Sequence, residues 1–392
     1  MVFLNFMLLI QNIILKFMTD NINRKKQAKE YERIKLVTGI VEGVLSFLLI
    51  LAFIVFGFTK KLEVFAAGYF SNAYLQILLF GAILGFITSV LSFPFDYFFG
   101  FRLEHKYGLS NLTFRGWIKE KFKGFLVGMV LGLPIVLFFY YLLSNFQYWW
   151  VLFGLIVTFY SVLLSQIAPI FIFPIFYKFK PIEDEALRNK LLALCEKVGF
   201  KIKGVYAFDM SKTTKKANAA FTGMGKTKRI IIGDTLISGF THDEIETVFA
   251  HELGHYKKGH IRKQIFLSFF STFAGLFVVS TLYDLLLPVF GFHSRWELAS
   301  LPLLMLIAGT LTFLLSPIGA YISRKYEYEA DRFAVSTTEN IEAFKSTMEK
   351  LAFQNLADVE PAGLVEFWFH SHPPIKKRIH AVEGYYHGLA KA

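Results

Sequence analysis

Hydrophobic residues occur along this chain in long runs that alternate with polar segments. A membrane-spanning helix needs roughly 20 predominantly apolar residues. Six runs are long enough, and they cover residues 36–57, 74–95, 124–143, 149–177, 264–288 and 300–322. A shorter run, Val2–Leu15, lacks the basic start and the small-residue cleavage site of a signal peptide, so we interpret it as a marginal first span. The pattern predicts a mainly α-helical, polytopic membrane protein with seven transmembrane helices.

Lysine and arginine are distributed unevenly between these runs. Segments 19–35 and 96–123 are rich in them, as is the region beyond 322, whereas 58–64 and 289–299 hold few. Cytoplasmic segments of membrane proteins carry the excess of basic residues. We therefore expect the N-terminus outside and the C-terminus inside, in the inner membrane of a bacterium or the endoplasmic reticulum of a eukaryote.

The polar segments divide the chain into four expected regions. Residues 1–180 form a membrane region with about five transmembrane helices, and 264–322 add two more. Between them, 181–263 form a cytoplasmic insertion, and 323–392 form C-terminal cytoplasmic helices.

Local patterns within the insertion predict a small sheet with flanking helices. The spacing of leucines predicts a helix over residues 183–198. Short strand-like runs separated by Lys, Thr and Gly turns predict strands at 204–209, 219–224 and 228–234.

Composition changes this picture little. The chain has 392 residues, of which 54% are hydrophobic, as expected for a membrane protein. Its single cysteine, Cys195, excludes an internal disulfide. The net charge of +12 is dispersed between apolar spans, which excludes nucleic acid as the expected partner and favours membrane lipid.

The strongest chemical signal is the sequence TVFAHELGHYKKGH at Thr247–His260. His251 and His255 stand four residues apart, so on a helix both imidazoles leave the same face and can bind one zinc ion. Glu252 turns its carboxylate toward a water on the open side of the metal, as a general base requires. The motif indicates metal-assisted peptide hydrolysis.

The sequence around these histidines predicts how their helix is built. Thr241 is a cap for its first turn, which is acidic. Ala250 and Gly254 are small residues that allow another helix to approach the histidines.

A third metal ligand has to come from elsewhere in the chain. His260 is the nearest histidine, but its spacing does not fit the metzincin pattern, and we expect a structural role for it. Glu327, just beyond the last span, is the better candidate. Asp331 lies one helical turn further on and can accept a proton from a ligating imidazole, whereas Glu329 points roughly 200° away from Glu327.

Near the C-terminus, the sequence FWFHSHPPIKKRIHAVE carries His372 and Arg378. Either side chain can donate a hydrogen bond to the oxyanion that forms on an attacked carbonyl.

With HELGHYKKGH, YEYEAD and HSHPPIKKRI in this order, the chain resembles the type I CAAX prenyl proteases, which are integral-membrane zinc metalloproteases. Further similar stretches lie at Arg102–Thr113, Ile167–Phe171 and Asn218–Leu236. The resemblance implies seven helices around a water-filled chamber, closed on the cytosolic side by the zinc domain.

The resemblance also implies roles for individual residues. One zinc ion is bound by His251, His255 and Glu327, Glu252 is catalytic, and His372 and Arg378 assist at the oxyanion. The segment that binds an extended substrate as an added strand comprises Asn218, Ala219, Ala220, Phe221 and Thr222.

Three functions compete at this point. The first is a zinc metalloendopeptidase that processes CAAX-type C-terminal peptides, with or without a prenyl group, and acts as a monomer. The second is a quality-control metalloprotease of membrane proteins. The third is a catalytically silent membrane scaffold that keeps zinc for structure.

Overall fold

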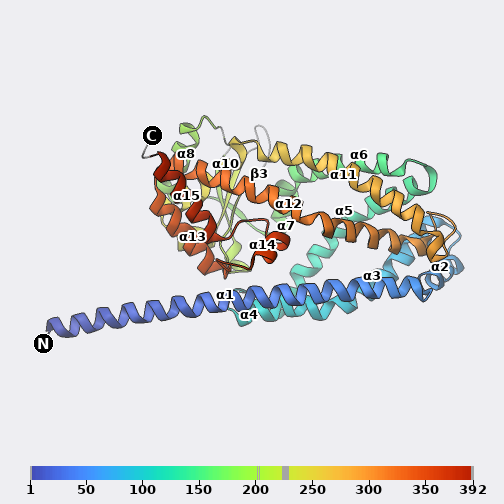
Figure 1. The fold of residues 1–392 in the computed structure, drawn as a ribbon, viewed down its shortest axis with the longest axis horizontal. Helices are drawn as coiled ribbons and strands as arrows, with labels where there is room; N and C mark the ends of the chain where they lie inside the picture. The colour runs from blue at the N-terminus through green and yellow to red at the C-terminus, as the bar shows by residue number, and fades with distance from the viewer. Residues whose placement is uncertain (1, 201, 203, 223–228, 390–392) are drawn as a thin grey trace.

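The computed structural model describes residues 2–200, 202, 204–222 and 229–389, with side chains from residue 23 onward except at 221, 222 and 389. The protein is mainly helical, as expected, and elongated (Figure 1). The helices of the membrane region are α1 (Val2–Val55), α2 (Phe58–Tyr69), α3 (Ala73–Tyr97), α4 (Glu104–Lys106), α5 (Phe114–Asn145), α6 (Trp149–Ile167), α7 (Phe173–Phe176), α11 (His260–Leu286) and α12 (Leu301–Thr338). The remaining helices are α8 (Glu185–Lys197), α9 (Asp234–Gly239), α10 (His242–Lys257), α13 (Ile341–Asn355), α14 (Gly363–Phe369) and α15 (Ile375–Leu389).

Among the residues with described side chains, six helices are long and apolar enough to cross a membrane. They correspond to the six long hydrophobic runs of the sequence. The predicted seventh span, Val2–Leu15, forms the first part of α1, which continues without a break to Val55, so the structure does not separate it from the next span and it stays a prediction.

The segments between the spans gather at two ends of the membrane region. At one end, Lys60 Nζ donates to the carbonyl of Gly291 (2.5 Å). At the other end, Arg24 of α1 donates through Nε to the carbonyl of Phe353 in the C-terminal region (3.1 Å). The basic segments thus lie with the soluble elements and the basic-poor ones lie opposite, which is the alternation that the charge pattern predicts.

The membrane region contains an apolar cavity of about 640 Å³ between α1, α3 and α12. Leu45, Phe80 and Met305 are among its lining residues. The larger water-filled chamber that the resemblance implies remains an expectation.

A four-stranded sheet lies in the soluble part, in the order β1-β2-β4-β3. The strands are β1 (Phe179–Pro181), β2 (Gly204–Phe208), β3 (Ala219–Thr222) and β4 (Arg229–Gly233). β2 and β4 are parallel, and the outer strands are antiparallel to their neighbours. The three predicted strands are present, and the sequence missed β1, a three-residue strand that ends in proline. Because β3 is the last strand in this order, it is an edge strand.

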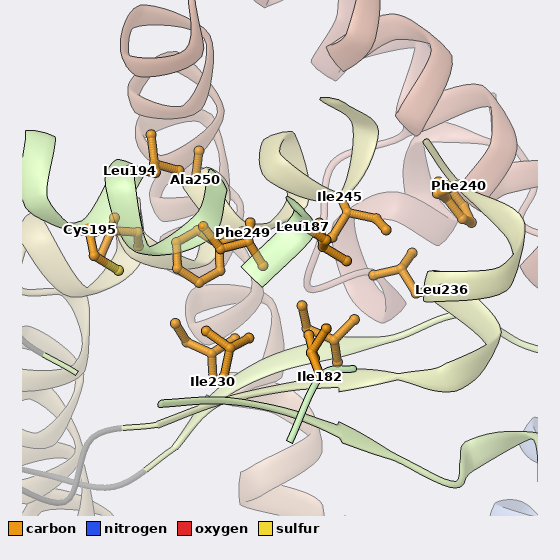
Figure 2. Close-up of a cluster of buried hydrophobic side chains, with 14 of the residues drawn as sticks. Ile182, Leu187, Leu194, Cys195, Ile230, Leu236, Phe240, Ile245, Phe249 and Ala250 are labelled. Carbon is orange, nitrogen blue, oxygen red and sulfur yellow. The ribbon is translucent and has the colours of Figure 1, made fainter. Parts of the chain in front are cut away.

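The helices α8 and α10 cover one face of this sheet. Figure 2 shows buried side chains of both helices above the strands, and Leu187, Ile230 and Phe249 are each at most 1% exposed. Burial of this apolar surface fixes the orientation of α10 relative to the sheet.

The most extensive helix contact joins α10 to α12 (Figure 1). A methyl group built on Gly254 would lie 3.1 Å from Ala330 Cα and 3.1 Å from Phe333 Cβ. Both Ala250 and Ala330 are 0% exposed. The small residues of the sequence motif do allow another helix to approach, and that helix is α12.

We predict that Gly254→Ala lowers the free energy of unfolding by about 1 to 2 kcal/mol, because the added methyl overpacks the contact with Ala330. The thermal unfolding midpoint of the detergent-solubilised protein measures this. The matched control is Gly384→Ala on α15, where nothing lies within 4 Å, and this change should be neutral or slightly stabilising. Equal midpoints for both variants would contradict the assigned contact.

Candidate metal centre

The helix that carries the HELGH motif is held at its start by a capping box. Thr241 Oγ1 accepts from the backbone N–H of Glu244, and the Glu244 carboxylate accepts from the N–H of Thr241. The same carboxylate accepts from Ser346 Oγ (2.5 Å) and Lys350 Nζ (2.8 Å) of α13. The predicted cap is thus present, and Glu244 also ties α10 to α13.

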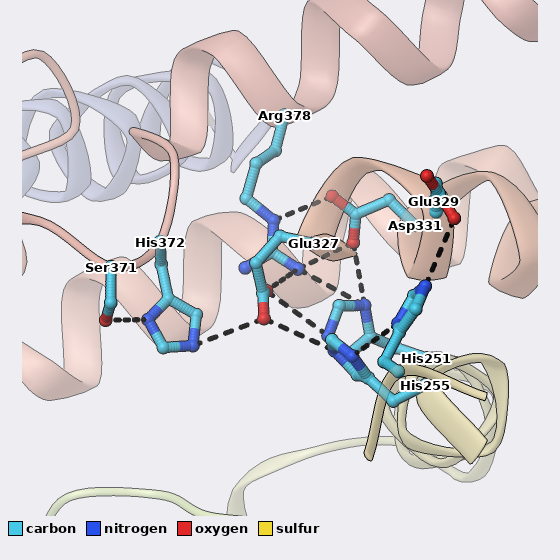
Figure 3. Close-up of polar contacts among 9 residues, drawn as sticks. His251, His255, Glu327, Glu329, Asp331, Ser371, His372 and Arg378 are labelled. Carbon is cyan, nitrogen blue, oxygen red and sulfur yellow. Dashed lines mark hydrogen bonds and ion pairs between the residues drawn. The ribbon is translucent and has the colours of Figure 1, made fainter. Parts of the chain in front are cut away.

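Three side chains bring their ligand atoms together between α10 and α12. His251 Nε2 and His255 Nε2 are 3.1 Å apart. Glu327 of α12 places one carboxylate oxygen 3.4 Å from the first nitrogen and the other 3.2 Å from the second. Figure 3 shows the two histidines on one side of Glu327 and His372 on the other.

These positions fit a metal ion. Ligands at about 2.0–2.2 Å in a tetrahedral site are roughly 3.3 Å from one another, close to the observed spacings. Glu327 is 5% exposed, and within the described part of the chain its Oε2 atom accepts no hydrogen bond. Burying a carboxylate oxygen that accepts no hydrogen bond costs free energy unless the oxygen binds a cation. Two imidazoles and a carboxylate suit zinc.

Asp331 fixes the orientation of His251. Its Oδ1 atom lies 2.8 Å from His251 Nδ1, so His251 donates through Nδ1 and points Nε2 toward Glu327. Arg378 of α15 donates to both Asp331 oxygens, through Nε (2.8 Å) and Nη2 (2.6 Å). Burial alone would lower the pKa of Arg378, but the Asp331 carboxylate outweighs it and raises the pKa above its usual value, so the guanidinium stays charged.

Glu252 lies in a cavity of about 260 Å³ that borders the cluster. No described residue donates a hydrogen bond to its carboxylate. Burial raises the pKa of Glu252, and the nearby histidines and Arg378 oppose this shift. A carboxyl group with a raised pKa is suited to accept and release a proton near neutral pH.

His372 reaches the cluster from the loop between α14 and α15. Its Nε2 atom is 3.4 Å from Glu327 Oε1, and its side chain is 64% exposed. Arg324 of α12, which the sequence did not single out, donates to the carbonyls of Glu366 (3.0 Å) and His370 (2.7 Å). It lies three residues before Glu327, so one face of α12 positions both Glu327 and the loop of His372.

The predicted substrate segment borders the same cavity in part. Asn218 and Ala219 line it together with Glu252 and the metal-ligand candidates. Ala220 does not line it, and the side chains of Phe221 and Thr222 lie outside the described ones.

Asn355, which the sequence did not single out either, holds the chain that enters this strand. Its Oδ1 accepts from the N–H of Ala217 (2.8 Å), and its Nδ2 donates to the carbonyl of the same residue (3.2 Å). No sequence pattern marks this asparagine, because it lies far along the chain from Ala217.

His260 and Glu329 also join the cluster, at its far side. His260 Nδ1 is 3.0 Å from His255 Nδ1, and His260 Nε2 is 3.1 Å from Glu329 Oε2. His260 is therefore not a third ligand, and its predicted structural role has a definite partner in His255.

The fold and this centre define a class of protein. A multi-pass helical membrane region carries a soluble part in which two histidines of an HExxH helix meet a glutamate of a second helix, and Glu252 lines a cavity beside them. This is the arrangement of a membrane metalloprotease, in which the two histidines and the glutamate could hold one metal ion.

Comparisons with known proteins agree with this class. Residues 181–386 match peptidase family M48, and residues 16–178 match the CAAX prenyl protease N-terminal region, which is described as five membrane helices. The chain belongs to peptidase family M48, and it is an integral, multi-pass membrane metalloprotease. Between residues 16 and 178 the described structure holds four helices long and apolar enough to span.

Three relatives illustrate the similarity. The chain is 30% identical to the "Uncharacterized metalloprotease YhfN" of Bacillus subtilis, over 91% of this chain and 84% of that one. It is 32% identical to the "CAAX prenyl protease 1 homolog" of Dictyostelium discoideum, over 91% and 86% of the two chains. The crystal structure of S. mikatae Ste24p superposes with a TM-score of 0.83 at 26% identity, covering 92% of this chain and 89% of that one.

We predict that Asp331→Asn weakens metal binding about 10- to 100-fold, because the amide leaves the Arg378 charge uncompensated and can present its NH₂ group to His251. Bound metal per chain, measured by elemental analysis after dialysis against a chelator, tests this. Glu360→Gln is the control, since that carboxylate is exposed and pairs with the exposed Lys376. Equal metal content in both variants would contradict the role of Asp331.

Proposed function

We propose that this protein is a zinc metalloendopeptidase that hydrolyses peptide bonds at the cytoplasmic surface of its membrane, with CAAX-type C-terminal segments of prenylated proteins as its substrates. The observation that carries the proposal is the convergence of two imidazole nitrogens, 3.1 Å apart, with the two carboxylate oxygens of Glu327, each 3.2 to 3.4 Å from one of the nitrogens, beside Glu252. One zinc ion per chain would be held by His251, His255 and Glu327.

When bound, zinc would polarise the scissile carbonyl and lower the pKa of water. Glu252 then accepts a proton from the attacking water and delivers it to the leaving amine. Burial raises the pKa of Glu252, which strengthens its carboxylate as a proton acceptor. Asp331 keeps His251 in the tautomer that presents Nε2.

Two side chains, His372 and Arg378, could donate a hydrogen bond to the oxyanion. His372 Nε2 lies 3.4 Å from Glu327 Oε1, and Ser371 Oγ lies 3.0 Å from the other ring nitrogen. Arg378 uses Nε and Nη2 to bind Asp331, which leaves Nη1 for the carbonyl oxygen. We propose that His372 is the main donor and that Arg378 contributes mostly through Asp331 and its charge.

The edge strand β3 supports binding of an extended peptide. An edge strand has unpaired backbone N–H and C=O groups, so a substrate can add as a further strand. The segment Asn218–Thr222 begins beside Glu252, and Asn355 fixes the chain just before it. Strand addition recognises a peptide through its backbone, and it would place one peptide bond of the substrate near the metal ligands.

The position of the site favours a membrane-bound substrate. Glu327 lies five residues beyond 322, where the last hydrophobic run ends, so a continuous α12 places it about 7 Å from that end. Relatives over most of the chain are named CAAX prenyl proteases. A prenyl group would hold the substrate's C-terminus at this depth, which favours CAAX processing over general quality control.

The proposed arrangement has a membrane region of residues 1–180 and 264–322. The insertion 181–263 and the C-terminal helices of 323–392 would complete the site on the cytoplasmic side, where the basic segments gather. We expect a monomer in contact with membrane lipid.

We predict that Glu252→Gln lowers kcat for peptide hydrolysis by about 10² to 10⁴ while zinc stays bound, because the amide cannot accept the proton of the attacking water. Activity and zinc content are measured on the same purified sample. Lys257→Gln on the same helix is the control, since this lysine donates to the carbonyl of Val198. Retained hydrolysis in the Glu252 variant would exclude it as the base.

We predict that matched C-terminal peptides with and without a farnesyl group differ by at least about tenfold in kcat/KM, in favour of the farnesylated peptide, since burial of each CH₂ stabilises by about 0.8 kcal/mol. The assay uses the protein in lipid nanodiscs. Equal kcat/KM values would indicate a general protease and would leave the metal site itself unaffected.

A further inference from the structure

One buried histidine beside the metal centre, His260, has no role in the proposed mechanism. His260 is the first residue of α11, and it is 2% exposed. Its ring stacks on Tyr326 with a centroid distance of 4.3 Å and an interplanar angle of 10°. Both of its ring nitrogens lie within hydrogen-bond distance of a partner, His255 on one side and Glu329 on the other.

The turn between α10 and α11 makes this contact possible. Gly259 has φ of +69°, a left-handed conformation that glycine adopts without strain. The turn brings His260 back beside His255, only five residues earlier in the chain. Figure 3 shows Glu329 beside the histidines, on the same helix as Asp331.

The hydrogen-bond directions in this chain follow from one condition. If His255 binds a metal through Nε2, its proton is on Nδ1, and Nδ1 donates. His260 Nδ1 must then accept, so His260 carries its own proton on Nε2. That N–H donates to Glu329, which is 3.1 Å away. No other assignment satisfies both contacts, because two N–H groups would otherwise face each other.

We propose that Glu329 and His260 are positioning residues that hold His255 in the metal-binding tautomer and orientation, as Asp331 does for His251. This inference rests on the proposed metal site. His251 and His255 are thus oriented by hydrogen-bond chains of different length. His251 donates directly to a carboxylate that Arg378 neutralises, whereas His255 reaches the Glu329 carboxylate through an intervening imidazole.

This hydrogen-bond chain requires an acceptor atom on the side chain of residue 329. It has to accept a hydrogen bond from His260, but it need not be charged. Glutamine keeps an acceptor oxygen at that position, whereas leucine removes it. A purely structural role in packing α11 against α12 would not distinguish the two substitutions in this way, because Glu329 is 31% exposed in its side chain.

The experiment measures zinc affinity by competition with a chromophoric chelator, on full-length protein in detergent. We expect Glu329→Leu to weaken zinc binding by about 10- to 100-fold and Glu329→Gln by less than about threefold. The matched controls are Glu342→Leu and Glu342→Gln on α13, where the side chain is 80% exposed, and neither should change the affinity. Unfolding midpoints of the zinc-free proteins check that all variants fold.

A second series tests whether the residues act as one chain. His260→Phe keeps an aromatic ring on Tyr326 but removes the acceptor for His255, so it should weaken zinc binding as much as Glu329→Leu does. The double variant should lose little more than either single variant. An unchanged affinity in Glu329→Leu, an equal loss in Glu329→Gln, or additive losses would each overturn the inference. A wild-type protein without bound zinc would overturn the proposed function as well.

Discussion

The close contact between α10 and α12 is the constraint on which the rest of this structure depends. Gly254 of one helix lies against Ala330 of the other, at a separation that a further methyl group would overpack. Helices that approach so closely bring short side chains within reach of each other. Glu327 can therefore meet His251 and His255 although it lies more than seventy residues away in the chain. The covering of the sheet by α8 and α10 and the capping box at Thr241 fix α10 itself.

Charge explains why so many elements converge here. Glu327 and Asp331 are both buried, and Arg378 is the single buried cation that faces them within the described part of the chain. The guanidinium makes its short hydrogen bonds to Asp331, and its Nη2 atom lies 3.4 Å from Glu327, which otherwise faces the rings of His251 and His255. Buried carboxylates without a paired charge are unfavourable. The cluster is thus prepared for a divalent cation, and binding of that cation also stabilises the contact between α10 and α12.

Much of this arrangement could be predicted from the sequence, and the reasons are local. The apolar runs have the length of spans, and the HExxH spacing places two histidines on one helical face, so neither needed tertiary information. Glu327 and Asp331 followed from a second helical spacing. Asn355, Arg324 and the partner of His260 could not be predicted, because their hydrogen bonds join segments that are distant in sequence. β1 was missed since three residues ending in proline carry no strand pattern. The seventh span and the substrate strand stay predictions.

The geometry of α12 explains how one helix can serve both histidines. Successive residues on a helix are rotated by about 100°, so Glu327 and Asp331 share a face while Glu329 lies on another. α10 turns into α11 at Gly259, and His260 follows the turn to the side of α12 that Glu329 occupies. Three residues of α12 thus lie around the histidines: Glu327 offers a candidate ligand, Asp331 an acceptor for His251, and Glu329 an acceptor for His260. Because α12 is continuous with a membrane span, all three are fixed relative to the bilayer, and the side of the cluster that faces β3 and His372 is left for the substrate.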